Sequence, residues 1–235
     1  MGRISKTLLF SGGLDSFALW HLLGRPQAVY VKLGHAYQNN EIETINRLGM
    51  SRDVLFLDGP NVGATEQQDG HIPQRNLLLA ATVAAMLQPE TIYIGALLGE
   101  TSRDKSGRFL HDSSRLLSWL ERPVHVEAPS RRMTKTQLVR RLLDFDPCLL
   151  DGLRNTVSCY GTKSGRCGRC MSCFRRWVAM SNNGIKEQYD VEPWRNVKVD
   201  ARYLWRSPLV EWPGVLRNQV DAMRAMRRVQ HGKYR

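Results

Sequence analysis

No apolar run in the 235-residue sequence approaches the roughly 20 residues that a transmembrane helix needs. The first residues, MGRISKTLLFSGG, contain one short apolar stretch that leads directly into glycines. They lack the longer apolar core and the small-residue cleavage site of a signal peptide. We therefore expect a cytoplasmic protein with no membrane partner. Its composition, 42% hydrophobic and 24% charged, is that of an ordinary globular protein.

Cysteine is scarce outside one short segment. Four of the five cysteines follow the spacing C-x7-C-x2-C-x2-C: Cys159, Cys167, Cys170 and Cys173. A disulfide-stabilised secreted domain would spread its cysteines more widely, so the clustering indicates a metal. Four thiolates complete a tetrahedral set for Zn²⁺ and leave no open position, which predicts a structural zinc. An iron–sulfur cluster and a redox-active dithiol are the alternatives. We expect Cys148 to be a buried thiol rather than a ligand.

Acidic residues are outnumbered, with 22 Asp/Glu against 34 Lys/Arg and a net charge of +12. Residues 201–235 hold eight Lys/Arg and two Asp/Glu, which is half of that net charge. This surplus of positive charge indicates either a polyanionic partner, such as nucleotide phosphates or nucleic acid, or a solvated basic surface. Trp194, Trp205 and Trp212 lie in the same region. We expect residues 181–235 to form a basic, Trp-rich segment that could contact nucleic acid or a second copy in a homodimer.

Strand-like and helix-like segments alternate over residues 1–145. The expected strands are residues 4–10, 28–33, 54–57, 91–97 and 124–126. The expected helices are residues 14–23, 41–48, 76–87, 113–120 and 135–143. This alternation predicts an α/β fold, a Rossmann-like parallel sheet with helices on both faces. The polar stretches 58–75 and 99–112 each follow a strand, so we expect them to be loops at the carboxyl edge, where ligands bind.

The string Ser11-Gly12-Gly13-Leu14-Asp15-Ser16 joins the first strand to the first helix. Glycines let backbone N–H groups approach an anion, and a helix N-terminus adds its positive dipole. The string predicts a phosphate-binding loop, although a plain strand–turn–helix junction is the simpler interpretation. It lacks the lysine of the Gly-x4-Gly-Lys-Ser/Thr loop. Asp15 is reasonable beside phosphates if it holds Mg²⁺ or caps the helix.

This string resembles the PP-loop of the ATP pyrophosphatases, which have an adenine nucleotide alpha hydrolase fold. The resemblance implies ATP cleavage between the α- and β-phosphates, transfer of AMP to the substrate, and a loop that holds the departing pyrophosphate. Together with the zinc prediction it implies three parts. These are a PP-loop nucleotide-binding domain at 1–145, a four-cysteine zinc module at 146–180 and the C-terminal segment at 181–235.

The cysteine segment narrows the resemblance. Thr156-Val157-Ser158-Cys159, then Cys167-Gly168-Arg169-Cys170-Met171-Ser172-Cys173, resembles the 7-cyano-7-deazaguanine synthase (QueC) family. Three further stretches fit that family's pattern: Ile72-Pro73-Gln74-Arg75-Asn76, Met133-Thr134-Lys135-Thr136, and Gly95 after a strand. The family turns 7-carboxy-7-deazaguanine, ammonia and ATP into a nitrile through adenylated intermediates. The implied catalytic residues are Asp15, Ser16, Arg75 and Lys135. The implied nucleotide-binding residues are Phe10, Ser11, Gly12, Gly13, Leu14, Asp15, Ser16, Asn76 and Gly95.

Two stretches depart from the family's pattern. Residues 34–41 contain the pieces of its Tyr-Gly-Gln stretch in another order. Residues 104–112 keep Asp104, Ser106 and Gly107 but lack its Tyr-Pro and Cys. Both fall on predicted substrate loops, so the resemblance supports ATP chemistry more strongly than it supports the identity of the substrate. The alternatives are a PP-loop enzyme that thiolates tRNA or makes lysidine, and an inactive nucleic-acid-binding protein built on the same scaffold. Without the motif context, Arg75 and Lys135 would be interpreted as surface salt-bridge partners.

Overall fold

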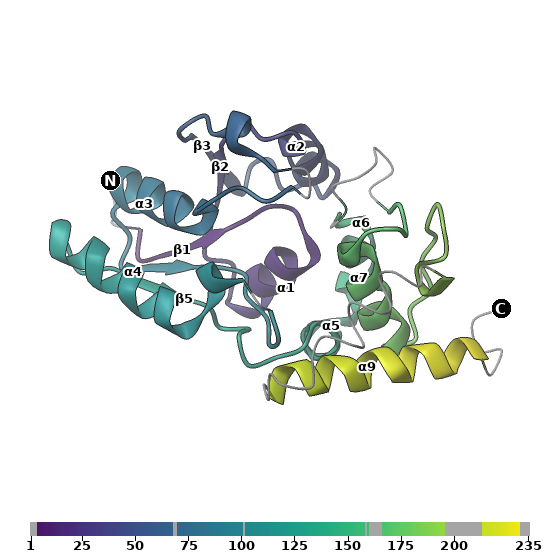
Figure 1. Cartoon of the computed structure of the whole chain (residues 1–235). Helices are drawn as coiled ribbons and strands as arrows, with labels where there is room; N and C mark the ends of the chain where they lie inside the picture. The colour runs from purple at the N-terminus through teal and green to yellow at the C-terminus, as the bar shows by residue number, and fades with distance from the viewer. Residues whose placement is uncertain are drawn as a thin grey trace. The chain divides into compact units, whose positions relative to one another are not determined.

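A computed structural model describes residues 4–67, 70–100, 102–157, 159, 166–195 and 213–230. Its central feature is a five-stranded sheet in the order β3-β2-β1-β4-β5 (Figure 1). The strands are β1 (Lys6–Leu9), β2 (Gln27–Lys32), β3 (Val54–Asp58), β4 (Thr91–Tyr93) and β5 (His125–Glu127). All four neighbouring pairs are parallel. The predicted α/β fold with a parallel sheet is therefore confirmed.

The strand order places a topological switch point between β1 and β4. The chain builds β1, β2 and β3 outward in one direction, then returns to add β4 and β5 on the other side of β1. Right-handed crossovers place α1 (Leu14–Leu22) and α2 (Gln38–Arg47) on one face, and α3 (Arg75–Leu87) and α4 (Gly107–Leu120) on the other. Ligands of such sheets bind where the carboxyl ends of strands diverge at the switch point.

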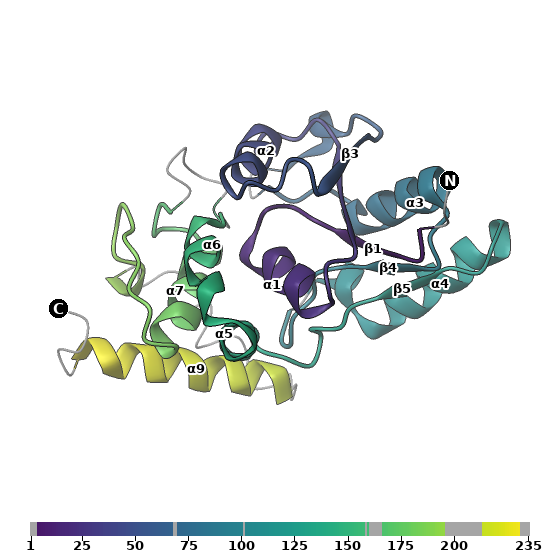
Figure 2. The same ribbon diagram turned by 180° about the vertical axis from the view of Figure 1, so that it is seen from behind.

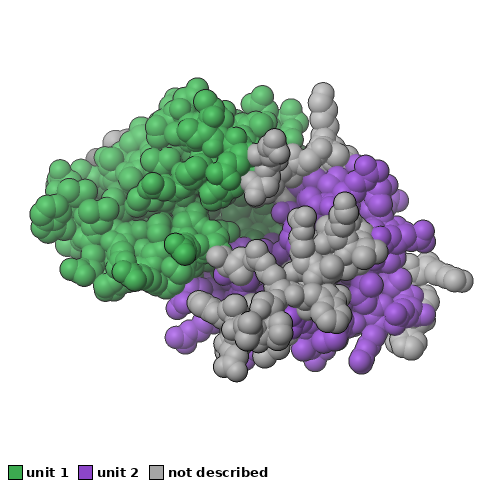
Figure 3. Space-filling view, in the orientation of Figure 1, with its two compact units in different colours: residues 1–96, 101–129 green, residues 97–100, 130–235 purple. Residues whose placement is uncertain are grey.

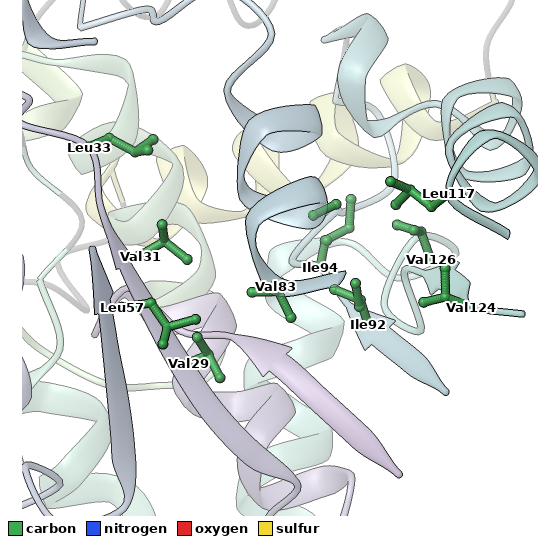
Figure 4. Close-up of a cluster of buried hydrophobic side chains, with 11 residues drawn as sticks. Val29, Val31, Leu33, Leu57, Val83, Ile92, Ile94, Leu117, Val124 and Val126 are labelled. Carbon is green, nitrogen blue, oxygen red and sulfur yellow. The ribbon is translucent and has the colours of Figure 1, made fainter. Parts of the chain in front are cut away.

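The core lies between the sheet and helices α3 and α4 (Figure 4). Alternate residues of one strand face opposite sides, so the β-branched members Val29 and Val31 point to this core while Tyr30 points away. The Tyr30 hydroxyl instead donates to Glu41 Oε2 on α2, at 2.9 Å. Buried members of this core include Leu33, Leu57, Ala80, Val83, Ile92, Ile94, Leu117, Val124 and Val126.

Two of the predicted loops are shorter than expected. Helix α4 begins at Gly107 rather than 113, because Ser106 caps it by accepting a hydrogen bond from the Phe109 N–H at 3.1 Å. The predicted loop 99–112 is thus helical from Gly107 onward, after a short 3₁₀ turn at Arg103–Lys105. Helix α2 begins at Gln38, so the stretch 34–41 is a turn followed by the first residues of a helix.

The chain forms two compact units, coloured separately in Figure 3. The first comprises residues 1–96 and 101–129, and the second comprises residues 97–100 and 130–235. Contacts therefore divide the chain at residue 130, whereas the sequence places a boundary at residue 145. The three-part division into 1–145, 146–180 and 181–235 stays a prediction.

The second unit is built from helices in the part of it that is described. These are α5 (Lys135–Phe145), α6 (Leu150–Asn155), α7 (Met171–Asn182) and α9 (Pro213–Gln230), with 3₁₀ turns at Pro147–Leu149 and Pro193–Arg195. Helix α9 runs alongside α7 (Figures 1 and 2). The small residues Ala222 and Ala225 of α9 pack against Phe174 and Trp177 of α7, and the Trp194 ring lies 5.2 Å from that of Trp177.

The prediction that Cys148 is buried is wrong: its thiol is exposed. It lies in the 3₁₀ turn that Asp146 caps, and this turn faces solvent at residues 147 and 148. The predictions that involve Trp205, Trp212 and Ser158 fall on residues outside the described ranges. Among the helices that are described, none has the length and apolar character needed to cross a membrane.

Candidate functional site

Residues 11–16, which the sequence predicts to be a phosphate loop, form a tight turn between β1 and α1. Phe10 is buried, and its N–H donates to the Val29 carbonyl at 2.8 Å, which extends the sheet to the start of the loop. Gly13 is the N-cap of α1, with extended backbone and no side-chain cap. The Ser16 hydroxyl accepts from the Ser11 N–H at 3.3 Å and donates to the Gly13 carbonyl at 3.1 Å. The Ser16 hydroxyl therefore closes the turn at the N-terminus of α1, where the first backbone N–H groups of the helix lie.

Gly12 needs to be a glycine for two reasons. Its φ is +70°, a conformation that side-chain-bearing residues rarely adopt. A Cβ at this position would also lie 3.1 Å from Thr44 Cγ2 and 3.4 Å from the Glu41 carbonyl oxygen. The loop therefore packs directly against helix α2, and its backbone shape is fixed by that contact.

Asp15 lies in the first turn of α1 and does not serve as the helix cap, because the cap is Gly13. A carboxylate in the first turn interacts favourably with the helix dipole. A Cβ built on Gly95 would lie 3.8 Å from Asp15 Cβ, so the chain after β4 passes beside this residue. Asp15 and Gly95 thus lie side by side at the β1/β4 switch point. The family resemblance implies one nucleotide site that contains both residues.

A polar cluster at the end of β2 occupies the stretch that departs from the family pattern. Glu41 Oε2 accepts from the Tyr30 hydroxyl at 2.9 Å and lies 3.1 Å from His35 Nε2. Burial, and then the charge and hydrogen bond of Glu41, raise the pKa of Tyr30 well above its usual range, so its hydroxyl keeps its proton. Gln38 closes the turn, because its Oε1 accepts from the Leu33 and Gly34 N–H groups at 2.9 Å each.

Arg75 is the first residue of α3 and reaches this cluster. Its Nη1 donates to the Tyr37 hydroxyl, and its guanidinium lies 6.0 Å from the centre of the Tyr37 ring. The Tyr37 ring is buried and lies 4.1 Å from the His35 ring. The structure therefore joins Arg75 to residues 35–41, a link that the sequence motifs did not predict.

Asn76, the next residue of α3, is buried and bridges to the 3₁₀ turn before α4. Its Nδ2 donates to Asp104 Oδ2 at 2.8 Å and to the Asp104 carbonyl at 3.2 Å. Asp104 is one of the residues that the altered stretch 104–112 keeps. The start of α3 is therefore tied to both altered stretches, through Arg75 on one side and Asn76 on the other.

Lys135 lies in the second unit, as the first residue of α5. Thr134 caps this helix in a capping box with Gln137, and the Thr134 hydroxyl donates to Asp221 Oδ2 of α9 at 2.8 Å. These contacts fix the backbone from which Lys135 projects. A role for Lys135 beside the phosphate loop stays a prediction.

The four predicted metal ligands lie together in the second unit. The Sγ atoms of Cys159, Cys167, Cys170 and Cys173 all lie within 4.8 Å of one another. The Cys167–Cys173 and Cys170–Cys159 sulfur pairs are each 3.9 Å apart. Zn–S bonds of about 2.3 Å in a tetrahedron require sulfurs about 3.8 Å apart, so the group fits Zn²⁺. The predicted four-cysteine group that could hold a metal is confirmed.

The local backbone is arranged to support thiolates. The Arg169 N–H donates to Cys167 Sγ at 3.3 Å, and the Cys173 N–H donates to Cys170 Sγ at 3.4 Å at the start of α7. Without a cation, the hydrogen bond with Cys159 and burial help raise the pKa of Cys170 to about 12. A bound cation reverses this, because it favours the ionised form of every ligand.

A buried ion pair lies behind the cysteine group, and sequence reasoning missed it. Arg176 is fully buried and donates to Glu187 at 2.8 and 2.9 Å, to Thr156 Oγ1 at 2.7 Å and to the Leu153 carbonyl at 2.9 Å. Glu187 also accepts from Tyr189 at 2.8 Å and pairs with Arg166 at 3.3 Å. The adjacent pair Arg175-Arg176 was visible in the sequence, but its glutamate partner eleven residues later gave no signal.

The model of one protein family, "Queuosine biosynthesis protein QueC", matches residues 41–184. The match spans more than half of the chain and includes most of α2, all of α3 and all four cysteines. The chain belongs to the QueC family. This confirms the resemblance on which the sequence prediction rested. The phosphate loop at 11–16 lies before the matched residues, so its assignment rests on its own sequence and geometry.

Curated proteins give the same result at low identity. A 7-cyano-7-deazaguanine synthase of Chlorobaculum tepidum is 26% identical, with 79% of this chain and 96% of that protein covered. One of Hahella chejuensis is 27% identical, with 74% and 87% covered. One of Chlorobaculum parvum is 27% identical, with 81% and 98% covered. Identities of 22–27% across such relatives describe a divergent QueC member.

Proposed function

We propose that the protein is an ATP-dependent ligase that converts 7-carboxy-7-deazaguanine and ammonia into 7-cyano-7-deazaguanine, a precursor of queuosine-type nucleosides. The observation that carries the proposal is the meeting of Asp15 and Gly95 at the β1/β4 switch point, in a chain of the QueC family. The proposal extends to this chain what the curated relatives are named for. ATP use and reduced cysteines fit a reaction in the cytoplasm.

The proposed reaction activates the same carbon twice. A carboxylate oxygen attacks the α-phosphorus of ATP, pyrophosphate leaves, and ammonia then displaces AMP and loses a proton to give the amide. The amide oxygen then attacks the α-phosphorus of a second ATP, pyrophosphate leaves, and the amide nitrogen loses one proton. The C–O bond breaks with loss of AMP and of the second N–H proton, which leaves the nitrile. Two activations are needed because hydroxide and oxide are poor leaving groups, whereas AMP is a good one.

Each proposed site residue has a role that follows from its chemistry. The N–H groups at Gly12, Gly13 and the start of α1 would hold the departing pyrophosphate, together with Ser11 and Ser16. Asp15 would bind Mg²⁺, a hard cation that prefers carboxylate oxygens. Phe10 and Leu14 are buried on either side of the loop and fix its backbone.

The remaining residues would act on the other phosphates and on the substrate. Arg75 and Lys135 would stabilise phosphate charge as it develops. Asn76 would support the nucleotide site through Asp104, and Gly95 would leave room beside Asp15. The four cysteines would hold a structural Zn²⁺, which supplies stability rather than chemistry because no coordination position is open.

A coupled pyrophosphate assay tests the proposal. Release should require 7-carboxy-7-deazaguanine, ammonium and ATP together, and no RNA. Replacing Ser16 with Ala removes a loop hydroxyl, and the rate should fall by about 10²-fold, the scale for loss of one preorganised donor. The matched control is Ser51→Ala, since Ser51 is an exposed serine whose hydroxyl donates to Asn46 Oδ1 at 2.7 Å. A Ser16→Ala variant as fast as Ser51→Ala would refute the loop assignment.

The charge on helix α9 supports a second candidate function, that of a PP-loop enzyme that modifies tRNA. Arg217, Arg224 and Arg227 are exposed on one side of this helix, a pattern that suits a phosphate backbone. Pyrophosphate release that appears only with tRNA would favour this candidate. Absence of turnover alongside salt-dependent RNA or DNA binding would favour an inactive nucleic-acid-binding protein. A homodimer also stays a proposal, supported by the exposed apolar residues Leu116, Trp119 and Leu120 on α4.

A further inference from the structure

The stretch 34–41, which departs from the family pattern, connects the phosphate loop to Arg75 by contacts within the first unit. Gly12 of the loop packs on α2 at Thr44 and at the Glu41 backbone. The Glu41 side chain holds His35 at 3.1 Å. These contacts are the first in a continuous path of neighbouring residues that leads from the loop to α2 and to the turn before α2.

The path continues through two rings. The His35 ring lies 4.1 Å from the Tyr37 ring, and the two planes are tilted by 58°. His35 Nδ1 is buried and has no hydrogen-bond partner among the described residues, so the bond from Nε2 and the ring contact orient this side chain. Tyr37 is 3% exposed and is the N-cap residue of α2, which fixes its backbone as well as its ring.

The path ends at Arg75. The Tyr37 hydroxyl accepts from Arg75 Nη1 and donates to the Gly70 carbonyl at 3.4 Å. A phenol in this position directs the guanidinium without cancelling its positive charge, as a carboxylate would. Side chains that must meet a phosphate are most effective when a second residue fixes their direction.

We propose that Tyr37 is a positioning residue for Arg75, and that the His35–Glu41–Tyr30 cluster holds Tyr37 in register with the phosphate loop. This rests on the proposed function in one respect, the role of Arg75 as a ligand for nucleotide phosphates. The altered stretch is then not a lost substrate motif. It supplies a phenol that orients an arginine.

A double-mutant cycle on nucleotide binding tests the proposal without depending on the substrate. The probe is α,β-methylene-ATP with Mg²⁺, which resists cleavage at the relevant bond, and its Kd is measured by calorimetry. The variants are Tyr37→Phe, Arg75→Ala and the two combined, with Tyr93→Phe as the control for losing the hydroxyl of another buried tyrosine, one that lies in β4. Tyr37→Phe keeps the ring that packs on His35, and its thermal unfolding should match that of Tyr93→Phe.

We expect Tyr37→Phe to weaken binding about fivefold, and Arg75→Ala to weaken it more, on the scale of a lost charge-assisted hydrogen bond. The double variant should bind like Arg75→Ala within about twofold, because Tyr37 acts only through Arg75. Unchanged binding in Tyr37→Phe, or independent effects that multiply in the double variant, would overturn the proposal. Failure of the wild-type protein to bind the probe would overturn it as well. Failure of 7-carboxy-7-deazaguanine to release pyrophosphate would instead sink only the proposed function.

Discussion

Two glycines of the second unit share a backbone conformation but differ in their surroundings. Gly168, between two predicted metal ligands, has a φ of +70°, and Gly184, after α7, has a φ of +74°. A Cβ on Gly168 would lie 1.6 Å from the Val191 carbonyl oxygen, whereas one on Gly184 would meet nothing within 4 Å. The pair therefore separates backbone strain from steric contact.

Replacing Gly184 with Ala should lower the free energy of unfolding by about 1–2 kcal/mol, the cost of the left-handed conformation alone. Gly168→Ala should cost about 1–3 kcal/mol more, because backbone must move to admit the methyl group. Urea denaturation of both variants measures the difference. Equal losses would mean that the Cys167–Cys170 turn does not pack against Val191 as described.

Glu187 is the buried acid whose partner is Arg176. Burial alone would raise its pKa, but the charge and hydrogen bonds of Arg176 outweigh burial and hold the pKa below its usual range. A carboxyl with a depressed folded pKa stabilises the fold above its unfolded pKa of about 4.3, and that stability is lost as the pH falls through the folded pKa.

Glu187→Gln should therefore lower the free energy of unfolding at pH 7 by about 3–5 kcal/mol, because it leaves Arg176 buried without a counter-charge. The difference from wild type should narrow below about pH 4, as the wild-type carboxyl becomes protonated. Denaturation of both proteins at several pH values checks this. Asp151→Asn, which removes an exposed ion pair with Arg154, is the control and should cost less than about 1 kcal/mol. A loss for Glu187→Gln that stays constant from pH 7 to pH 3 would be the contrary finding.

At the scale of elements, periodicity predicted the sheet well. The strands expected at 28–33, 54–57 and 124–126 each overlap an observed strand. The inner strand β2 is buried on both faces, whereas the edge strands β3 and β5 also carry exposed residues. The start of α4 was missed because Ser106-Gly107 resembles a loop until its cap is seen. Helix α9 was missed because the apolar residues that it buries most completely, Ala222 and Ala225, are small, and only their packing against α7 shows that they belong to a core.

The four-cysteine element was predicted completely, since ligand spacing is a local property of the sequence. Cys170→Ser should release about one equivalent of zinc and lower stability, because metal binding and folding are coupled. Cys148→Ser, at an exposed thiol outside the group, should keep its metal. Elemental analysis of both purified variants decides the point, and full zinc content in Cys170→Ser would mean that the ligand set is wrong.

At the scale of the whole molecule, the fold and the family could be predicted, but the contacts between distant motifs could not. Residues 11–16 and Gly95 were expected in one site because the family resemblance implied it, and both follow strands of the parallel sheet. The contact between Tyr37 and Arg75 joins residues 38 positions apart, and no periodicity predicts such a pair. The return of residues 97–100 to the second unit is likewise a tertiary feature, which no local pattern indicates.

The central claim, that this QueC-family chain makes a nitrile from a carboxylate, is tested most directly by mass spectrometry of the reaction. The purified protein is incubated with 7-carboxy-7-deazaguanine, Mg-ATP and ¹⁵N-ammonium. The account predicts 7-cyano-7-deazaguanine that carries one ¹⁵N atom, with two AMP and two pyrophosphate for each nitrile formed. Unchanged carboxylate with no AMP under these conditions, or AMP formation that requires tRNA, would contradict it.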